Sequence, residues 1–227
     1  MDFVGIDKFS LLDFDEKVSV VLFSPACNFR CPFCHNGESV LNSNTPIPFD
    51  EIYKFLNTRV GLIDAVVFTG GEPTLMPELK DRIKKVRELG FLIKLDTNGT
   101  NPEILQDLIN DNLVDYVAMD IKNSESRYPL TAGCQKIEMN KIKKSIEILR
   151  NSCINYEFRT TLVQEFHNDV SILEMCELVK GAKKLYLQKF VDREGVIQKG
   201  LHEVSLEEAN HFKDILSKVV PTELRGY

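Results

Sequence analysis

Short apolar runs alternate along the chain with longer amphipathic segments. The runs are rich in β-branched and aromatic residues and are bounded by turn residues, which is typical of buried strands. Six runs are expected to form strands: Val18–Phe23, Ala65–Thr69, Phe91–Asp96, Tyr116–Asp120, Tyr156–Leu162 and Lys184–Phe190.

Apolar residues recur at helical spacing in the segments between these runs. The clearest segments are 79–86, 101–109, 140–149, 172–179 and 205–219. The second begins with Asn101-Pro102-Glu103, which places proline in the first turn and an acid near the positive end of the helix dipole. The last begins with Ser205-x-x-Glu208, a capping box.

This alternation of strands and helices predicts an α/β fold. Six β-α units in one run favour a parallel sheet with right-handed crossovers. Both a doubly wound sheet and an open partial barrel have this order of elements. The 227 residues contain no linker, repeat or low-complexity stretch, so we expect a single domain. The longest irregular segment, 123–139, has the length of a functional loop.

Polar residues follow the predicted strands at their carboxyl ends. They are three cysteines after the first strand, Thr69-Gly70-Gly71-Glu72-Pro73, Asp96-Thr97-Asn98-Gly99, Asp120-Ile121-Lys122, Arg159 and Gln188. Parallel α/β folds assemble their sites at this edge of the sheet. The sequence therefore predicts one site built from all of these segments.

These residue types suit a small charged ligand. The glycines of segment 70–73 allow backbone to approach a ligand closely, and its glutamate can accept hydrogen bonds from an ammonium. Lys122 and Arg159 can bind a carboxylate. A ligand with an amino group, a carboxylate and a positive sulfur fits this mixture. Segment 70–73 could also be only a tight turn, and Asp96 and Asp120 could only cap helices or bind loop amides.

The three cysteines form the segment Cys27-Asn-Phe-Arg-Cys31-Pro-Phe-Cys34. Four cysteines would hold every iron of a four-iron cluster or close the shell around a structural zinc. Three leave one iron without a protein ligand, free to bind a small molecule. The competing interpretation is a zinc site completed by His35, although adjacent residues rarely point at one metal.

Composition and charge narrow the function classes. The net charge of −6 and the pI near 5.4 give no reason to expect nucleic-acid binding. No apolar run approaches about 18 residues, so no membrane span is expected. Charged residues within the first eight positions argue against a secretory signal and for a cytoplasmic protein. In that compartment cysteines favour metal or redox chemistry over disulfides. The scattered cysteines are expected to be small buried hydrophobic residues: Cys134, Cys153 and Cys176.

Together these residues resemble the radical S-adenosylmethionine superfamily. Cys27, Cys31 and Cys34 are similar to its three-cysteine loop, with Phe33 as the aromatic residue before the last cysteine. Gly70-Gly71-Glu72-Pro73 is similar to its glycine-rich motif.

A closer resemblance is to the glycyl-radical-enzyme activases. It rests on Cys34-His35-Asn36, Asp96-Thr97-Asn98-Gly99, Asp120-x-Lys122 and Tyr128-x-Leu130-Thr131-x-Gly133. Ser10-Leu11-Leu12-Asp13 and Glu223-Leu224-Arg225-Gly226 resemble the branch that activates anaerobic ribonucleotide reductase. Phe14-Asp15-Glu16 departs from that branch, where Tyr-Pro-Gly is expected. The resemblance runs from about Gly5 to the C-terminus.

The resemblance implies a fold and its organisation. The fold is a partial (β/α)6 open barrel with a parallel sheet, and residues 1–227 form one radical S-adenosylmethionine domain. Within it lie an N-terminal lead-in (1–17), a cluster loop (24–38) and a C-terminal tail (220–227).

The resemblance also implies a set of site residues. Cys27, Cys31 and Cys34 would ligate a [4Fe–4S] cluster, whose open iron binds S-adenosylmethionine. The implied contacts to S-adenosylmethionine are Phe33, Gly70, Gly71, Glu72, Asp96, Asn98, Lys122, Arg159 and Gln188. By similarity to pyruvate formate-lyase activase, a monovalent cation would be held by Asp96, Thr97 and Asp120 with the Ala118 carbonyl.

The implied reaction cleaves S-adenosylmethionine reductively. An electron from the cluster breaks the bond from sulfur to the 5′ carbon, and the 5′-deoxyadenosyl radical takes hydrogen from a glycine of a partner enzyme. The implied partners are an anaerobic ribonucleotide reductase and an electron donor such as flavodoxin or ferredoxin.

Three alternatives stay open. The first is an activase of another glycyl radical enzyme, such as pyruvate formate-lyase. The second is an enzyme acting on a small molecule, such as a 7-carboxy-7-deazaguanine synthase-like protein. The third is a zinc- or cluster-stabilised binding module, which leaves the Gly-Gly-Glu-Pro, Asp-Thr-Asn-Gly and Asp-x-Lys motifs unexplained.

Overall fold

A single curved sheet organises the chain in the computed structural model, which describes residues 2–37 and 45–227. The sheet order follows the chain order, β1 to β8. The strands are β1 Gly5–Ser10, β2 Ser19–Ser24, β3 Ala65–Gly70, β4 Leu92–Thr97, β5 Tyr116–Asp120, β6 Asn155–Leu162, β7 Leu185–Lys189 and β8 Thr222–Arg225.

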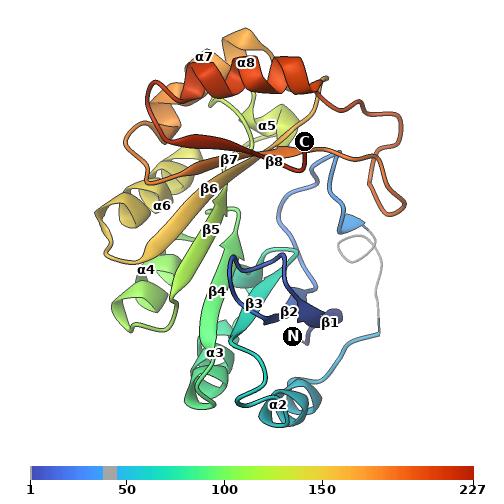
Figure 1. Ribbon diagram of the computed structural model, residues 1–227, viewed down its shortest axis with the longest axis vertical. Helices are drawn as coiled ribbons and strands as arrows, with labels where there is room; N and C mark the ends of the chain where they lie inside the picture. Colours follow the sequence, from blue (N-terminus) through green and yellow to red (C-terminus); the bar gives the residue numbers. More distant parts are fainter. Residues whose placement is uncertain (1, 38–44) are drawn as a thin grey trace.

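The sheet forms a barrel that does not close. Strands β2 to β8 each pair in parallel with their neighbours, while β1 pairs antiparallel with β2. Strands β1 and β8 are the two edges in the described part of the chain. The sheet curves like an open C, with helices outside it (Figure 1). The predicted open partial barrel is therefore confirmed.

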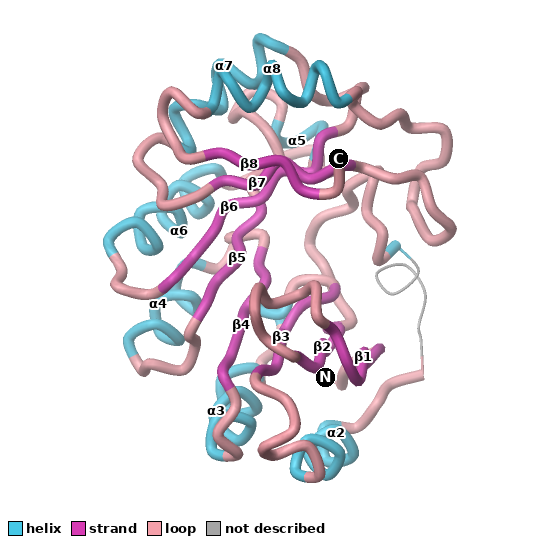
Figure 2. Tube along the Cα trace, viewed as in Figure 1, coloured by secondary structure: helices cyan, strands magenta, loops and turns pink. Residues whose placement is uncertain are grey.

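Helices cover the convex face of the sheet (Figure 2). They are α2 Phe49–Asn57, η1 Pro73–Leu75, α3 Leu79–Glu88, α4 Pro102–Asn110, α5 Tyr128–Thr131, α6 Met139–Asn151, α7 Asp169–Val179 and α8 Leu206–Leu216. The Ser205 hydroxyl accepts a hydrogen bond from Glu208 N at 3.2 Å, which is the serine half of the capping box predicted for α8. No helix among the described residues is long and apolar enough to cross a bilayer.

Alternation along each strand separates the core from the lumen of the barrel. In β4, Ile93 and Leu95 are fully buried in the main core beneath the helices. Lys94 and Asp96 alternate with them and face the opposite side, because successive side chains of a strand point to opposite faces. The lumen therefore receives the polar residues that the sequence places inside strands.

The loop before β2 forms the floor of the lumen. We call residues 10–17 and Arg225 the floor. The ring of Phe14 packs on Tyr116 with 5.5 Å between the ring centroids. Arg225 from β8 binds the buried carboxylate of Glu157 at 3.0 Å and reaches Asp15 at 3.5 Å. This end of β2 lies opposite the cysteine loop, which follows the carboxyl end of the same strand.

The six predicted strands are present within one residue at each end, but two further strands were missed. β1 lies in the predicted lead-in (1–17), and β8 in the predicted tail (220–227). Helix α2 was also missed, and the segment 123–139, predicted to be irregular, contains the short helix α5. The end of the predicted cluster loop (24–38) at residue 38 lies outside the described residues.

Candidate active site

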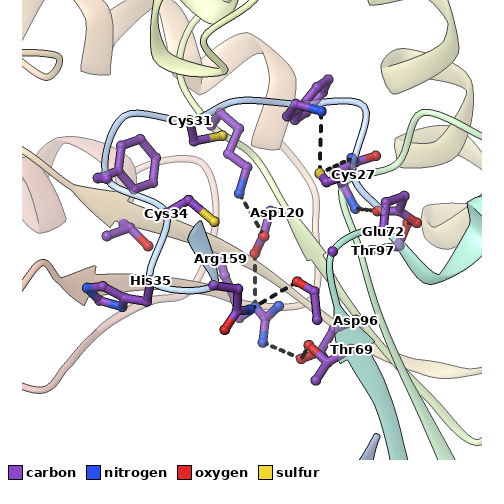
Figure 3. Close-up of a pocket in the computed structure, with 18 of the residues that line it drawn as sticks. Cys27, Cys31, Cys34, His35, Thr69, Glu72, Asp96, Thr97, Asp120 and Arg159 are labelled. Atoms are coloured by element: carbon purple, nitrogen blue, oxygen red, sulfur yellow. Dashed lines mark hydrogen bonds and ion pairs between the residues drawn. The ribbon is translucent and has the colours of Figure 1, made fainter. Parts of the chain in front are cut away.

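One cavity of about 370 Å³ opens at the carboxyl ends of the strands. Every residue that the sequence predicted to ligate the cluster, the cation or S-adenosylmethionine through its side chain lines it. The residues labelled in Figure 3 converge from the cysteine loop and from β3 to β6 with the turns that follow them, and Gln188 joins them from β7. Seven other lining residues were not among the predicted ligands of the cluster, the monovalent cation or S-adenosylmethionine: Asp13, Phe23, Phe29, His35, Asn36, Thr69 and Thr161.

The three cysteines of the loop are free thiols beside this cavity. Burial raises the pKa of Cys27 to about 11 and that of Cys31 to about 12, so without a metal both stay protonated at neutral pH. Among the described residues, no three His, Cys, Asp or Glu side chains converge on a point where one ion could bind.

His35 has a different partner from the one that a zinc site would need. Its Nε2 lies 2.9 Å from the carbonyl oxygen of Val191, and its ring stacks on Phe190 at 5.8 Å between centroids. Figure 3 shows the ring turned away from the thiols. The structure therefore weakens the zinc interpretation and gives His35 the role of fixing the loop after β7 against the cysteine loop.

Two glycines bring the cysteine loop against β3. A Cβ on Gly71 would lie 2.1 Å from the carbonyl oxygen of Ala26, which precedes Cys27. Gly70 has φ +105°, and a Cβ there would lie 2.4 Å from Ser24 N. The Asn36 side chain then donates to Gly70 O at 3.0 Å. The glycine pair is thus required by close packing, and it presents backbone to the cavity.

A third glycine supports the loop from the other side. A Cβ on Gly133 would lie 1.9 Å from Arg30 O, and Arg30 N donates to Ala132 O at 2.9 Å. The Tyr128 hydroxyl donates to Asp120 O at 3.3 Å. The Tyr-x-Leu-Thr-x-Gly segment therefore buttresses the cysteine loop, a role that its sequence alone does not reveal.

Glu72 is a fully buried carboxylate whose partners are neutral. Its Oε1 accepts from Thr74 N, Thr74 Oγ1 and Thr97 Oγ1 at 3.1, 2.5 and 2.8 Å. Its Oε2 accepts from Asn98 N at 2.6 Å. Burial raises the pKa of Glu72, while these hydrogen bonds oppose that shift. Since a carboxylate has about four acceptor positions, two on each oxygen, Oε2 retains one for a further donor.

Asn98 ties this carboxylate to the cysteine loop. Its Nδ2 donates to Asn28 Oδ1 at 2.8 Å and lies 4.0 Å from Cys27 Sγ. Its Oδ1 accepts from Thr100 N at 3.0 Å. The side chain of Asn98, predicted to contact S-adenosylmethionine, is therefore already engaged in holding the loop around Cys27.

The opposite wall of the cavity is charged. Asp120 binds Lys122 Nζ at 2.8 Å and Arg159 Nε at 3.1 Å, and Arg159 also reaches Asp96 at 3.2 Å. Lys122 lies over the Phe33 ring at 5.9 Å. Each partner holds the next in place, which is the preorganisation that a binding site needs.

The pKa values follow from these contacts. Burial opposes ionisation of Asp120, but Lys122 and Arg159 outweigh burial and lower the pKa of this carboxyl. Burial likewise opposes charge on Lys122, and Asp120 nevertheless raises the pKa of Lys122. These groups are therefore charged at neutral pH, and the wall offers cations to an anionic ligand.

Most side-chain oxygens predicted to bind the cation already have hydrogen-bond partners, but Asp96 Oδ1 is buried without one in the described residues. The Thr97 hydroxyl donates to Glu72 and accepts from Gly99 N at 3.1 Å. Asp96 and Asp120 are bound by Arg159 and Lys122. The Thr97 hydroxyl and the two carboxylates are thus held by groups of the chain itself, apart from Asp96 Oδ1.

Outside the cavity, the expectation for the scattered cysteines was wrong. Cys153 is exposed, and Cys134 and Cys176 are half-buried. Cys134 and Cys176 each pack against the main core, whereas Cys153 follows helix α6 in an exposed turn.

The remaining residues fit an iron–sulfur cluster with bound S-adenosylmethionine. The three thiols face one cavity, Glu72 keeps one acceptor position, and the charged wall suits a carboxylate. Phe33 and Gln188 complete the lining, so an aromatic surface is also available.

Comparisons with known proteins agree with this geometry. A relative from Methanocaldococcus jannaschii, named "Putative glycyl-radical enzyme activating enzyme", is 34% identical and covers 82% of this chain and 78% of its own. A pyruvate formate-lyase-activating enzyme from Clostridium pasteurianum is 28% identical and covers 81% and 79%. A 7-carboxy-7-deazaguanine synthase from Thermococcus kodakarensis is also 28% identical and covers 71% and 70%.

The fold and the family model lead to the same assignment. A solved radical SAM methyltransferase from Sphaerobacter thermophilus has a similar fold, with a TM-score of 0.72 at 16% identity, covering 93% of this chain and 67% of its own. The model of the Radical SAM superfamily matches residues 21–179. With its cysteine loop and its partial barrel, this chain belongs to the radical SAM superfamily, which implies an iron–sulfur cluster and S-adenosylmethionine.

Proposed function

We propose that this chain activates a glycyl radical enzyme, and that the partner is an anaerobic ribonucleotide reductase. The relative at 34% identity, which covers most of both chains and bears an activase name, supports the reaction class. The finer assignment rests on the two segments that resemble the reductase-activating branch. These segments are Ser10-Leu11-Leu12-Asp13 and Glu223-Leu224-Arg225-Gly226.

Each wall of the cavity has a separate task in this proposal. Cys27, Cys31 and Cys34 hold a [4Fe–4S] cluster. The backbone of Gly70 and Gly71 and the remaining acceptor position of Glu72 receive the amino group of S-adenosylmethionine. Lys122 and Arg159 stabilise its carboxylate or ribose in the charged wall, with Asp96 beneath them.

Other residues complete the binding of S-adenosylmethionine. Phe33 and Gln188 pack beside the adenosine, and Asn98 keeps the loop around Cys27 in place. When bound, the cluster and S-adenosylmethionine supply reductive cleavage to methionine and a 5′-deoxyadenosyl radical. A partner loop bound over the open cavity would exclude water from that reaction, which protects a reactive radical from side reactions.

The open face of the barrel suits a protein substrate. An extended loop of the partner can enter at the carboxyl ends of the strands and present its glycine to the cavity. A flavodoxin or ferredoxin of the cytoplasm supplies the electron in this proposal.

The test is anaerobic. We expect the reconstituted protein, with dithionite and S-adenosylmethionine, to produce a glycyl radical signal on anaerobic ribonucleotide reductase but not on pyruvate formate-lyase. A signal only on pyruvate formate-lyase would move the assignment to that partner. Accumulation of 5′-deoxyadenosine with no signal on either would contradict the activase proposal.

A second candidate function is 7-carboxy-7-deazaguanine synthesis. The relative from Thermococcus kodakarensis, which covers about 70% of both chains, favours it. Such an enzyme would consume a pterin-like substrate in the presence of magnesium. Failure to consume that substrate, by a preparation that cleaves S-adenosylmethionine, would remove this candidate.

A further inference from the structure

A row of five charged side chains runs from the charged wall of the cavity into the lumen. In order, they are Lys122, Asp120, Arg159, Asp96 and Lys94. Every oxygen of the two carboxylates lies within 3.6 Å of a cationic nitrogen, and the last of these contacts is Lys94 Nζ to Asp96 Oδ1. Three cations thus face two carboxylates, which leaves the row with one positive charge in excess.

Lys94 is the member of this row that the sequence gave no reason to choose. It is 5% exposed and lies on the same face of β4 as Asp96. Its ammonium donates to the carbonyl oxygen of Asp13 in the floor and lies 5.7 Å from the centre of the Tyr116 ring. Lysine is almost never this buried unless it is paired, so its contacts with Asp96 and the floor explain its presence.

Asp96 depends on Lys94 in return. Its Oδ2 accepts from Thr69 Oγ1 at 3.1 Å and from Arg159. Its Oδ1 is buried and has no hydrogen bond in the described residues, so the charge of Lys94 at 3.6 Å is its compensation. A bound cation in contact with this oxygen would lie close to two side chains of its own charge.

We propose that Lys94 and Arg159 are built-in counter-ions, which take the place of a monovalent cation at Asp96 and Asp120. Resemblance to pyruvate formate-lyase activase implies such a cation, and Thr97 would be one of its ligands. In this chain the Thr97 hydroxyl is bound to Glu72, and the carboxylates are bound by the chain's own cations. The charged wall therefore has its full positive charge in any salt.

The wild-type protein tests this directly. We would measure the thermal midpoint of the apoprotein and the affinity of the reconstituted protein for S-adenosylmethionine. Both are measured in potassium, sodium and choline chloride at one ionic strength, so that the screening of charges is equal. We expect both quantities to be the same in the three salts. A saturable increase with potassium or sodium that choline does not give would overturn the proposal.

A variant pair tests the role of Lys94. Lys94→Met removes the ammonium and leaves Asp96 Oδ1 buried without compensation, so a saturable stabilisation by potassium or sodium should appear in the apoprotein. Lys94→Arg keeps the charge and should stay insensitive to the cation. If a folded Lys94→Met protein is not stabilised by potassium or sodium, Lys94 does not take the place of a cation. If Lys94→Met fails to fold in all three salts, the wild-type comparison among the salts decides the proposal.

Discussion

The two ends of strand β2 hold the cavity by different physical means. The carboxyl end of β2 continues into the cysteine loop, and we call this end of the cavity the mouth. There the loop is fixed by close contacts of glycines and by neutral hydrogen bonds, such as that from Asn36 to Gly70 O. At the floor, Phe14 packs on Tyr116, and Arg225 neutralises the buried Glu157. The mouth leaves thiols and polar atoms facing the cavity, whereas the floor satisfies its charges internally. For β2, the carboxyl end thus serves chemistry and the amino end serves stability.

The strongest expected effect is on the mouth. Cys31→Ala should abolish cluster retention and lower the free energy of unfolding of the apoprotein only modestly, because this buried core residue loses a single sulfur atom. Iron and sulfide content after reconstitution, with urea unfolding of the apoprotein, measures both. Cys153→Ala is the matched control, since this exposed cysteine lies outside the cavity. Full iron content in Cys31→Ala would show that the mouth does not hold the cluster.

The floor should respond in the opposite way. Arg225→Met leaves the carboxylate of Glu157, 2% exposed, without its cation, although Tyr116 still donates to it at 2.8 Å. Breaking a buried ion pair by removing one partner costs about 3 kcal/mol of unfolding free energy. The double variant with Glu157→Gln should recover part of that loss in urea unfolding. An Arg225→Met protein as stable as wild type would show that the ion pair with Glu157 does not stabilise the floor.

The pH dependence of stability should reveal His167, a neutral side chain that supports the backbone at Lys122. His167 is 2% exposed, accepts from Val163 N and lies 3.0 Å from Lys122 O, and burial lowers its pKa from 6.5 to about 4. Because the folded pKa is the lower one, the unfolded chain takes up the proton first as the pH falls. The contribution of His167 is therefore lost from about pH 6.5 downwards, about 2 kcal/mol between pH 7 and pH 5.

The comparison with His167→Gln isolates this contribution from the other titrating groups. Urea unfolding of both proteins at the two pH values should show a smaller pH dependence in the variant. Equal pH dependence in the two proteins would mean that His167 is not buried as a neutral ring.

The sequence predicted the strands and the chemistry of the mouth better than the floor. The strand Tyr116–Asp120 was predicted without error because its apolar run is flanked by clear turns. β8 has only four residues, two of them charged, and it exists because Leu185 to Gln188 pair with it. An edge strand of this kind depends on tertiary contacts that no local pattern records.

The gathering of the predicted residues at one cavity could be predicted from the sequence, but their partners could not. Glu72 was expected to meet an ammonium, yet four donors from Thr74, Thr97 and Asn98 already surround it. The sequence did not single out Lys94, because a lysine within a predicted strand does not show whether its side chain faces the lumen. Which donor meets which acceptor is decided by strand register and barrel curvature.

The smallest expected effect sharpens the description of the floor. Glu16 has φ +62°, a left-handed conformation that disfavours residues with a Cβ, and it occupies the position where the reductase-activating branch is expected to have glycine. Glu16→Gly should therefore stabilise the protein by about 0.5 kcal/mol, whereas Glu16→Ala should not. Thermal unfolding of the two variants beside wild type measures the difference. A loss of stability in Glu16→Gly would contradict the strained turn.

Reductive cleavage by the reconstituted protein tests the central claim, that the mouth of this barrel holds S-adenosylmethionine against a cluster on three cysteines. The measurement is 5′-deoxyadenosine formed anaerobically with dithionite and S-adenosylmethionine, in wild type and in Cys31→Ala. The account predicts product from wild type and none from the variant. No product from a wild-type preparation with a full cluster, or equal product from both proteins, would contradict it.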